Sequence, residues 1–450
     1  MSRKNISRWS FRYALLKIYT GFFHNFIFYK KIEVAGKENI PKNQALIFSS
    51  NHQNALMDPL AVIFNIKGQP VYLARSDIFG NSIIDSVLTL IKILPIYRIR
   101  DGAESLKKND EVFDDTVRIL KNKKYLAILP EGNHAGFRKL RIFKKGISRI
   151  VFKAEEATDF KLDIKVVPIG LDYDNYTAFR TKLFINFGKP IDVSQFFDLY
   201  KENANKGMNA LKAELHDRIS ELMIDIQNDE YYDTYMHLRE IYSNIYKNKF
   251  KEVKGNLHSK FVADKSMIKK LDDFNLSDAK GMEELSKKVV TYWKGVSDLK
   301  IENCLFEKKK IKLSNLFFRL IGMLLLLPFY LWGTIFNYIP YKIPVLATKK
   351  IKDLQFHSSF TYALHLFSFP IFYLIWILIF RSFTEILWVK FAFAALLPIT
   401  GLFAFEYFNW FIKLKALWTF NYLQIKKDSR IRKLVELRKE IIEIMNKVTK

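Results

Sequence analysis

The sequence predicts an α/β fold with a mostly parallel central sheet flanked by helices, followed by a helical extension and a C-terminal membrane helix module. Three observations indicate this order. Short apolar runs alternate with amphipathic helical patterns up to about residue 191. Charged helical patterns follow without strands, and the segment 316–411 is then dominated by long runs of leucine, isoleucine and phenylalanine.

The expected strands are short apolar runs at 32–36, 45–49, 71–74, 125–129, 164–169 and 184–191. Helical patterns separate them at 59–66, 83–93, 104–121 and 147–156. This alternation is typical of a parallel sheet, because each parallel connection needs a crossover that a helix can supply. From 193 to about 299 the chain has helical patterns with charged faces, such as 211–226 and 231–246, and they carry no chemical motif.

The N-terminal stretch at 1–30 predicts an amphipathic helix. Its large apolar side chains recur at helical spacing: Trp9, Tyr13, Leu16, Tyr19, Phe23 and Phe26. Two placements fit this pattern equally well. The helix lies either at a membrane interface or against the core of its own domain.

Three apolar segments, at 320–336, 359–380 and 386–405, are candidates for membrane spans. Lysine and arginine are dense before the first segment, between the first and second, and after the third, and such regions tend to stay in the cytoplasm. We therefore expect the first segment, which holds Pro328, to be a re-entrant or interfacial hairpin and the other two to form a spanning pair. The tail from 426 to 450 predicts a basic amphipathic helix on the membrane surface.

The formal net charge of +26 indicates an anionic partner. Because the apolar segments hold the chain in a bilayer, we expect that partner to be anionic phospholipid and not nucleic acid. Cys304 is the only cysteine, which excludes an intrachain disulfide and argues against a zinc site. These features favour an integral protein of the cell (inner) membrane with its α/β domain facing the cytoplasm.

A histidine and an aspartate lie close together after the apolar run 45–49, as His52 and Asp58. A neutral imidazole accepts a proton well near neutral pH, and a nearby carboxylate can fix its tautomer, so the pair can act as a general base. No serine or cysteine stands out as a nucleophile, so the activated hydroxyl belongs to a substrate. The alternative is structural: Asp58 caps a helix that starts at Pro59, and His52 is a hydrogen-bonded surface residue.

Three further blocks follow in the same region. Residues 94–98 predict a turn that presents Arg98 near a strand end. Glu131, Gly132 and Asn133 follow the strand at 125–129, and a basic loop comes next with Arg138, Arg141, Lys144 and Lys145. The fourth block, 166–170, contains Pro168.

These four blocks, in this order, resemble the glycerolipid acyltransferase family over about 33–191. The resemblance implies that His52 deprotonates the acceptor hydroxyl while Asp58 holds His52. It also implies that Arg98 binds the acceptor phosphate, that Glu131 and Gly132 shape the acceptor pocket and that Pro168 lies on the acyl side. No metal or redox cofactor is implied.

The chain departs from the family pattern at three places. Five residues separate His52 from Asp58, where four are commonest, and the longer spacing resembles the branch that acylates glycerol 3-phosphate or dihydroxyacetone phosphate. Lys92 occupies a position that is usually glycine. Asn133 and His134 stand where threonine and arginine are common, so Arg138 or Arg141 is expected to supply any missing phosphate contact.

We therefore expect a membrane-bound O-acyltransferase of phospholipid biosynthesis. Its donor is acyl-CoA or acyl-ACP, and its acceptor is glycerol 3-phosphate first or lysophosphatidic acid second. The alternatives are a lipid acyl hydrolase that uses the same His/Asp pair and a non-catalytic membrane lipid-binding protein. The expected parts are the N-terminal helix at 1–30, the catalytic domain at 31–228, a helical extension at 229–312, the membrane module at 313–413 and the basic amphipathic tail at 414–450.

Overall fold

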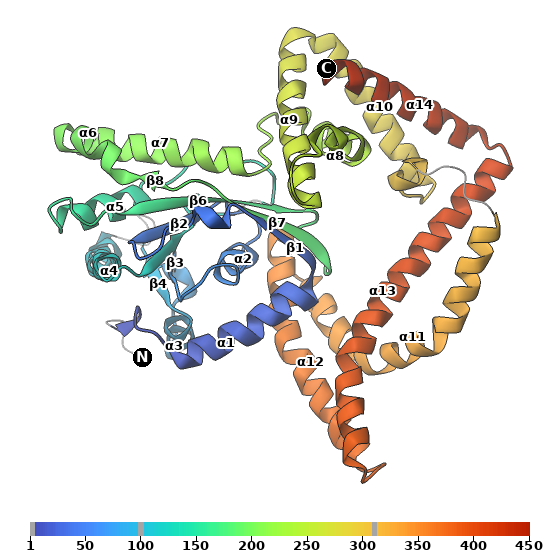
Figure 1. The fold of residues 1–450 in the computed structure, drawn as a ribbon, viewed down its shortest axis with the longest axis horizontal. Helices are drawn as coiled ribbons and strands as arrows, with labels where there is room; N and C mark the ends of the chain where they lie inside the picture. Colours follow the sequence, from blue (N-terminus) through green and yellow to red (C-terminus); the bar gives the residue numbers. More distant parts are fainter. Residues whose placement is uncertain (1–4, 98–102, 135, 308–312) are drawn as a thin grey trace. The chain divides into compact units, whose positions relative to one another are not determined.

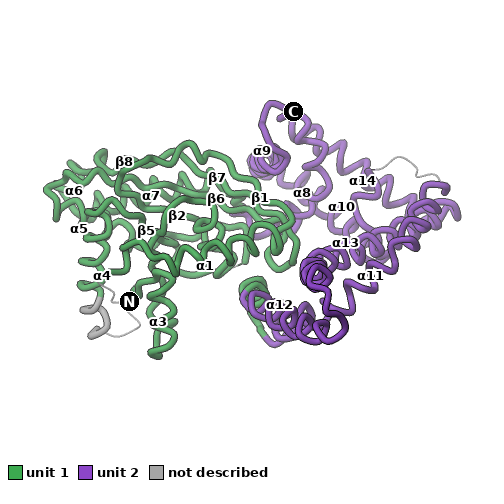
Figure 2. Tube along the Cα trace, turned by 60° about the horizontal axis from the view of Figure 1, so that its bottom comes forward, with its two compact units in different colours: residues 1–225, 351–362 green, residues 226–350, 363–450 purple. Residues whose placement is uncertain are grey.

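The computed structural model describes residues 5–97, 103–134, 136–307 and 313–450 (Figure 1). The chain forms two compact units, coloured separately in Figure 2. The first unit contains Met1–Asp225 together with the short segment Ile351–Tyr362. The second contains Ile226–Lys350 and Ala363–Lys450. The α/β domain is therefore completed by a piece of chain that lies far away in the sequence.

The first unit is built on one sheet, which has eight strands within the described ranges. Its order is β1-β7-β6-β2-β5-β3-β4, with β8 paired to β6. The strands β2 to β6 pair in parallel, whereas β7 and β8 are antiparallel to β6. This arrangement confirms the predicted mostly parallel sheet. The strands are β1 Tyr29–Ala35, β2 Leu46–Ser50, β3 Val71–Arg75, β4 Ile93–Ile96, β5 Tyr125–Ile128, β6 Lys165–Tyr173, β7 Thr181–Phe187 and β8 Ile191–Asp192.

Helices cover both faces of this sheet (Figure 1). On one face, side chains of α4, α5 and α7 join alternate residues of the central strands, such as Ile47 and Leu126, in a single apolar cluster. On the other face, the Tyr72 hydroxyl donates to the carbonyl of Pro59 in α2. Burial on both sides explains why the central strands are continuous apolar runs. The helices of this unit are α1 Phe11–Phe22, α2 Met57–Ile63, α3 Ser82–Leu90, α4 Ala103–Lys121, α5 Gly146–Glu156, α6 Phe197–Glu202 and α7 Ala204–Leu222.

The predicted turn at 94–98 is wrong, because residues 93–96 form strand β4. Helix α3 ends at Leu90, and the buried Leu94 joins the core cluster. Pro95 is tolerated because β4 is the last strand of the sheet. On the outer side of this strand no neighbouring strand needs a backbone N–H to pair with. Lys92 has φ +62°, a left-handed conformation that explains why glycine suits this position.

The expected strand at 184–191 is two strands, since β7 ends at Phe187 and β8 begins at Ile191. Gly188, in the link between them, donates its N–H to the carbonyl of Pro168 in β6. Both strands run antiparallel to β6 and follow one another along it, so the break interrupts the pairing without reversing the chain.

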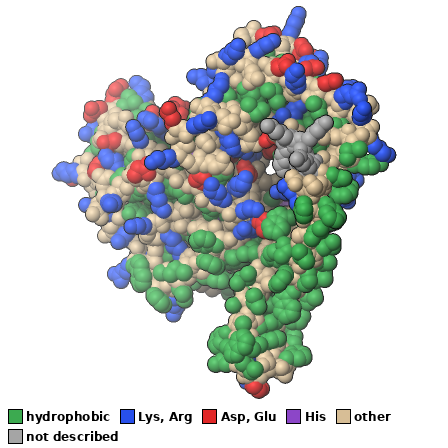
Figure 3. Space-filling view, turned by 45° about the vertical axis from the view of Figure 1, so that its right-hand side comes forward, with side chains coloured by type: hydrophobic (Ala, Val, Ile, Leu, Met, Phe, Trp, Pro, Cys, Tyr) green, Lys and Arg blue, Asp and Glu red, His purple; other side chains and the backbone are tan. Residues whose placement is uncertain are grey.

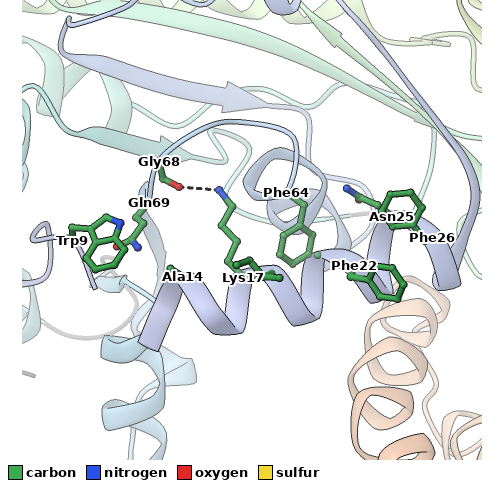
Figure 4. A pocket seen from close by; sticks show the side chains of 11 residues that line it. Trp9, Ala14, Lys17, Phe22, Asn25, Phe26, Phe64, Gly68 and Gln69 are labelled. Carbon is green, nitrogen blue, oxygen red and sulfur yellow. Dashed lines mark hydrogen bonds between the residues drawn. The ribbon is translucent and has the colours of Figure 1, made fainter. Parts of the chain in front are cut away.

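The N-terminal helix satisfies features of both predicted placements. Tyr13 and Phe23 are buried, whereas Trp9 and Phe26 are 69% and 64% exposed. The Lys17 ammonium donates to the carbonyls of Ile66 and Gly68, and burial lowers its pKa to about 8. Figure 4 shows the groove that α1 forms with the loop after α2, which contains Gly68 and Gln69. The helix is thus fixed to its own domain and still presents an apolar face.

The second unit is helical, and three of its helices are long and apolar enough to cross a membrane: α11 Leu313–Thr348, the greater part of α12 His357–Arg381, and α13 Leu387–Ile425. Figure 3 shows hydrophobic side chains gathered on their surface. The remaining helices are α8 Tyr232–Tyr246, α9 Asn256–Ser277, α10 Ala279–Asp298 and α14 Ser429–Val448.

The predicted hairpin in the first apolar segment is wrong. Helix α11 is continuous over 36 residues, with Pro328, Pro340 and Pro344 inside it. Proline kinks a helix without reversing the chain. Helix α13 likewise runs unbroken through residue 413, where the membrane module was expected to end.

The tail forms the predicted amphipathic helix α14, but its apolar face is not free for a membrane surface. Ile431, Leu434, Ile441 and Met445 are buried within the second unit. Leu434 packs against Gly295 of α10, and the Lys288 ammonium pairs with the Glu440 carboxylate at 2.6 Å. The surface-lying placement of the tail is therefore wrong, because the helical extension covers the same face.

Gly170 in β6 lies against the end of α7, and we predict that G170A destabilises the first unit. A Cβ there would lie 1.9 Å from the Leu222 carbonyl oxygen, so backbone must move. We expect a loss of about 3 kcal/mol or more, measured as a lower melting temperature of the detergent-solubilised protein. G146A is the matched control, since a Cβ at Gly146 meets nothing within 4 Å. Equal melting temperatures for the two variants would contradict the close packing.

Candidate active site

The sheet brings two of the sequence blocks together at one edge. Strands β2 and β5 are parallel neighbours, with Ser49 opposite Ile128. His52 follows the end of β2, and Glu131 follows the end of β5. Carboxyl ends of adjacent parallel strands meet at the same edge, where α/β proteins commonly place their sites.

His52 and Asp58 form a hydrogen-bonded pair, with 3.0 Å between Nδ1 and Oδ2. The imidazole side chain is 14% exposed, whereas the carboxylate is fully buried. Oδ2 also accepts from two backbone N–H groups, so it acts as an acceptor and Nδ1 carries the proton. Nε2 is then the unprotonated nitrogen, on the side of the ring away from Asp58.

Asp58 does not cap its helix, so the structural alternative for this residue is wrong. Helix α2 begins at Met57, and its N-cap is Leu56. The Asp58 carboxylate reaches back and accepts from the N–H groups of Gln53 and Asn54, both at 2.7 Å. The Tyr173 hydroxyl donates to its other oxygen at 2.8 Å. Burial and the Asp58 charge raise the pKa of Tyr173 well above its usual value, which keeps this hydroxyl protonated.

Glu131 connects the end of β5 to the His52–Asp58 pair. Its Oε1 accepts from the backbone N–H of His52 at 2.6 Å, and its Oε2 accepts from the backbone N–H of Arg141 at 3.4 Å. The side chain is buried, and burial raises the pKa of this carboxyl to about 8 against the opposing effect of the two N–H groups. Glu131 therefore fixes the backbone that carries His52.

The residues next to Glu131 are exposed. In the basic loop after them, one arginine is buried and another is exposed. Gly132, at φ +68°, and Asn133 are exposed. Arg138 is 5% exposed and is occupied inside the domain: Nε pairs with Asp172 at 3.2 Å, and the guanidinium lies over the Tyr176 ring. Arg141 is exposed beside Glu131. Of the two arginines expected to contact phosphate, Arg141 is therefore the accessible one.

The two remaining predicted residues are Arg98 and Pro168. Arg98 lies outside the described residues, directly after Tyr97, whose backbone N–H and carbonyl both bond to the Asn109 side chain. Pro168 is buried in β6 opposite Ser49, within the sheet.

Several contributors had no signal in the sequence. The Asn51 side chain exchanges two hydrogen bonds with the backbone of Leu171, at 2.8 and 3.1 Å, and so extends the pairing of β2 with β6. Tyr173 orients Asp58 from β6. The His134 ring lies edge-on to that of His52, with centroids 5.1 Å apart, and burial together with the charge of His52 lowers the pKa of His134. Within the described ranges, no group of three or more His, Cys, Asp or Glu side chains is placed to hold a metal ion.

The raised pKa of Glu131 predicts a pH-dependent stability difference between the wild type and E131Q. Between about pH 4.5 and 8 the unfolded chain has lost this proton and the folded chain keeps it, so wild-type stability falls as pH rises through this window. Each pKa unit corresponds to about 1.4 kcal/mol, and glutamine carries no such cost. The melting temperature of E131Q minus that of the wild type should therefore increase up to about pH 8 and then level off.

The exposed Glu38 supplies the control, because E38Q should show no comparable change of melting temperature difference with pH. A constant difference for E131Q across the same pH range would mean that the buried carboxyl is ionised throughout.

Comparisons with known proteins match the part of the chain that forms the α/β domain. Residues 31–172 match the family described as Acyltransferase. The chain is 27% identical over 183 residues to a 1-acyl-sn-glycerol-3-phosphate acyltransferase of Borreliella burgdorferi, covering 38% of this chain and 66% of that protein. It is 28% identical over 129 residues to glycerol-3-phosphate O-acyltransferase 2 of Saccharomyces cerevisiae, covering 28% of this chain and 17% of that protein.

The chain thus spans just under two thirds of the first relative and about a sixth of the second. The crystal structure of the 1-acyl-sn-glycerophosphate acyltransferase PlsC from Thermotoga maritima aligns with a TM-score of 0.34 and 18% identity, over 47% of this chain and 79% of that one. The family match at 31–172 begins before β2 and contains both the His52 and the Glu131 blocks. Residues 31–172 therefore form an acyltransferase domain that is similar in sequence to those of glycerolipid acyltransferases.

Proposed function

We propose that this protein is a membrane-bound O-acyltransferase that moves a fatty acyl group from a thioester donor to the free hydroxyl of a phosphorylated glycerol. Glycerol 3-phosphate is the first candidate acceptor and lysophosphatidic acid the second. One observation carries the proposal: His52 is oriented by a fully buried carboxylate, so that a basic nitrogen is available on a partly exposed ring. The names of the two relatives support acceptors of this class.

In the proposed reaction, Nε2 of His52 takes the proton of the acceptor hydroxyl as the hydroxyl oxygen attacks the thioester carbonyl carbon. Asp58 stabilises the resulting imidazolium through its bond to Nδ1. The C–S bond then breaks, the electron pair leaves on sulfur, and the imidazolium returns the proton to that thiolate. An ester and a free thiol result. Coenzyme A and acyl carrier protein both provide such a thioester.

The acceptor phosphate needs a cation near the catalytic edge, and Arg141 fits best among the described residues. Its side chain is exposed, while its backbone is fixed to Glu131, which in turn holds His52. A planar guanidinium binds phosphate in a bidentate manner, so it can orient the glycerol as well as attract it. Arg98 is retained as a second phosphate ligand. Gly132 and Asn133 are proposed to line the acceptor pocket, and Pro168 to lie on the acyl side.

Membrane attachment suits the proposed lipid product. Three helices are long and apolar enough to span a bilayer, and little of their apolar windows is buried in protein. On the first unit, α1 and α3 expose large apolar side chains such as Phe11 (68%) and Ile83 (76%). The net charge of +26 favours an anionic surface. We propose the cell (inner) membrane, with the catalytic domain on the cytoplasmic side.

We predict that H52A lowers acyl transfer from a radiolabelled acyl thioester to glycerol 3-phosphate about 10²- to 10⁴-fold, because the general base is lost. Protein recovered in the membrane fraction should be unchanged. H258A, a histidine of helix α9, is the matched control and should keep wild-type turnover.

The same assay separates the two alternatives by its products. Labelled acylglycerol phosphate supports transfer, whereas labelled free fatty acid would favour a hydrolase. Full turnover by H52A would remove this residue from the mechanism. A wild type that binds membranes but consumes no thioester, with any phosphorylated glycerol tested, would favour a non-catalytic lipid-binding protein.

We also predict that R141A raises the KM for the acceptor about 10- to 100-fold, with a smaller effect on the KM for the acyl donor. A charge-assisted hydrogen bond contributes about 1.5–3 kcal/mol, which corresponds to this range. R149A removes an exposed arginine from helix α5 and should leave both KM values near those of the wild type. Equal increases in both KM values for R141A would argue against specific binding of phosphate.

A further inference from the structure

A short segment from the C-terminal half of the chain lies beside the catalytic loop of the first unit. Ile351–Tyr362 belongs to this unit, although about 125 residues of the second unit precede it in sequence. It contains a 3-10 turn, Leu354–Phe356, and the first residues of α12. Ser358 and Ser359 are 1% and 6% exposed, and Tyr362 donates its hydroxyl to the carbonyl of Thr20 in α1.

The two serines bond to the loop that connects His52 to helix α2. The Ser359 hydroxyl oxygen accepts from the backbone N–H of Leu56 at 3.0 Å. The Ser358 hydroxyl donates to the side-chain oxygen of Asn54 at 2.6 Å. These contacts fall on the two neighbours of Ala55, one on each side.

Ala55 has an unfavourable backbone conformation, with φ +40°. A residue with a Cβ pays about 1–3 kcal/mol for such a conformation, which persists only where its surroundings hold it. Here the conformation matters, because the N–H groups of Gln53 and Asn54 just before it both donate to Asp58. If the loop relaxed, Asp58 would lose two donors, and its orientation toward His52 would change.

The 3-10 turn makes a second connection to the site. The Phe356 ring lies perpendicular to the ring of His134, with centroids 4.6 Å apart, and His134 lies edge-on to His52 at 5.1 Å. The Gln355 side chain also lies next to that of His134. The segment therefore restricts the catalytic imidazole from the side of the β5 block as well as from its own loop.

We propose that Ser358 and Ser359 are positioning residues of the active site, which hold the strained loop at Ala55 so that Asp58 and His52 keep their catalytic geometry. Their hydrogen bonds go to Asn54 and Leu56, in the loop that follows His52. This inference rests on the proposed function for its kinetic test. It adds that the catalytic domain is incomplete without the start of helix α12.

The test uses the full-length protein with S358A, S359A and the double variant. We expect the double variant to lose about 10- to 100-fold in kcat, because small displacements at a catalytic site have effects of this size, while the acceptor KM changes less than about threefold. S382A is the matched control, since Ser382 follows the same helix at its other end and is exposed. It should retain wild-type kcat.

A second substitution distinguishes positioning from general loss of folding. Glycine adopts positive φ without penalty, so A55G should remove the need for the clamp. In the S358A/S359A background, A55G should restore at least a third of the decrease in log kcat. This increase in kcat should be larger than the change that A55G causes in the wild type. A double variant with wild-type kcat, or a loss that A55G leaves unchanged, would overturn the proposal.

A readout without turnover separates this inference from the proposed function. Diethyl pyrocarbonate modifies neutral imidazole nitrogens, and peptide mass spectrometry gives the rate at His52 alone. We expect this rate to change at least threefold in S358A/S359A and to return toward the wild-type value with A55G. If the wild type transfers no acyl group but the labelling responds in this way, the proposed function fails and the positioning role stands. Unchanged labelling together with wild-type kcat refutes the clamp.

Discussion

The Asp58 carboxylate is the point on which the organisation of the site depends. It is fully buried and accepts hydrogen bonds from the His52 ring, from two consecutive backbone N–H groups and from the Tyr173 hydroxyl. A buried charge is tolerated only when such donors surround it. The same donors also fix the orientation of the carboxylate. One set of hydrogen bonds therefore both stabilises the buried charge and orients the imidazole. Strand β6 takes part through Tyr173, and the loop after β2 takes part through its backbone.

The parallel sheet explains why distant blocks of sequence meet at this carboxylate. His52 and Glu131 follow neighbouring parallel strands, and Glu131 bonds to the backbone of His52. Glu131 differs from Asp58 in its donors, since it accepts from two N–H groups, one of them at 3.4 Å, and burial raises its pKa to about 8. Two buried acids close together thus serve different purposes. Asp58 is supplied with enough donors to carry a charge beside the imidazole, whereas the carboxyl of Glu131 is largely neutral near pH 7 and ties two backbone segments together.

Local pattern was sufficient to predict the sheet and the proximity of His52 to Asp58, because strand periodicity and the ends of parallel strands are local properties with a fixed spatial consequence. Local pattern failed where the structure of a segment depends on a contact with residues far away in the sequence. Pro95 suggested a turn, and only the place of β4 at the sheet edge permits a strand. The tail has an amphipathic pattern that suits a membrane or a helix equally, and α10 is the surface that covers it. Arg138 and Arg141 looked alike in sequence, and Asp172 and Tyr176 distinguish them by burying the first.

The start of α12 is another segment whose role could not be predicted from local sequence, and it lies at the candidate site itself. Residues from 359 onward have the composition of a membrane span. In the sequence, the serine pair at the beginning of this span is typical of the polar residues that flank a membrane helix. In the structure these hydroxyls are buried against Asn54 and Leu56. Hydroxyls at the first turn of a helix often satisfy that helix's own N–H groups, but Ser359 accepts instead from the N–H of Leu56, the N-cap of α2. The start of α12 thus supplies an acceptor to the N-cap of α2, at the end of the loop that follows His52. The surroundings of the His52–Asp58 pair therefore come from two segments that residues 226–350 separate in sequence, and no motif confined to 31–172 contains all of them.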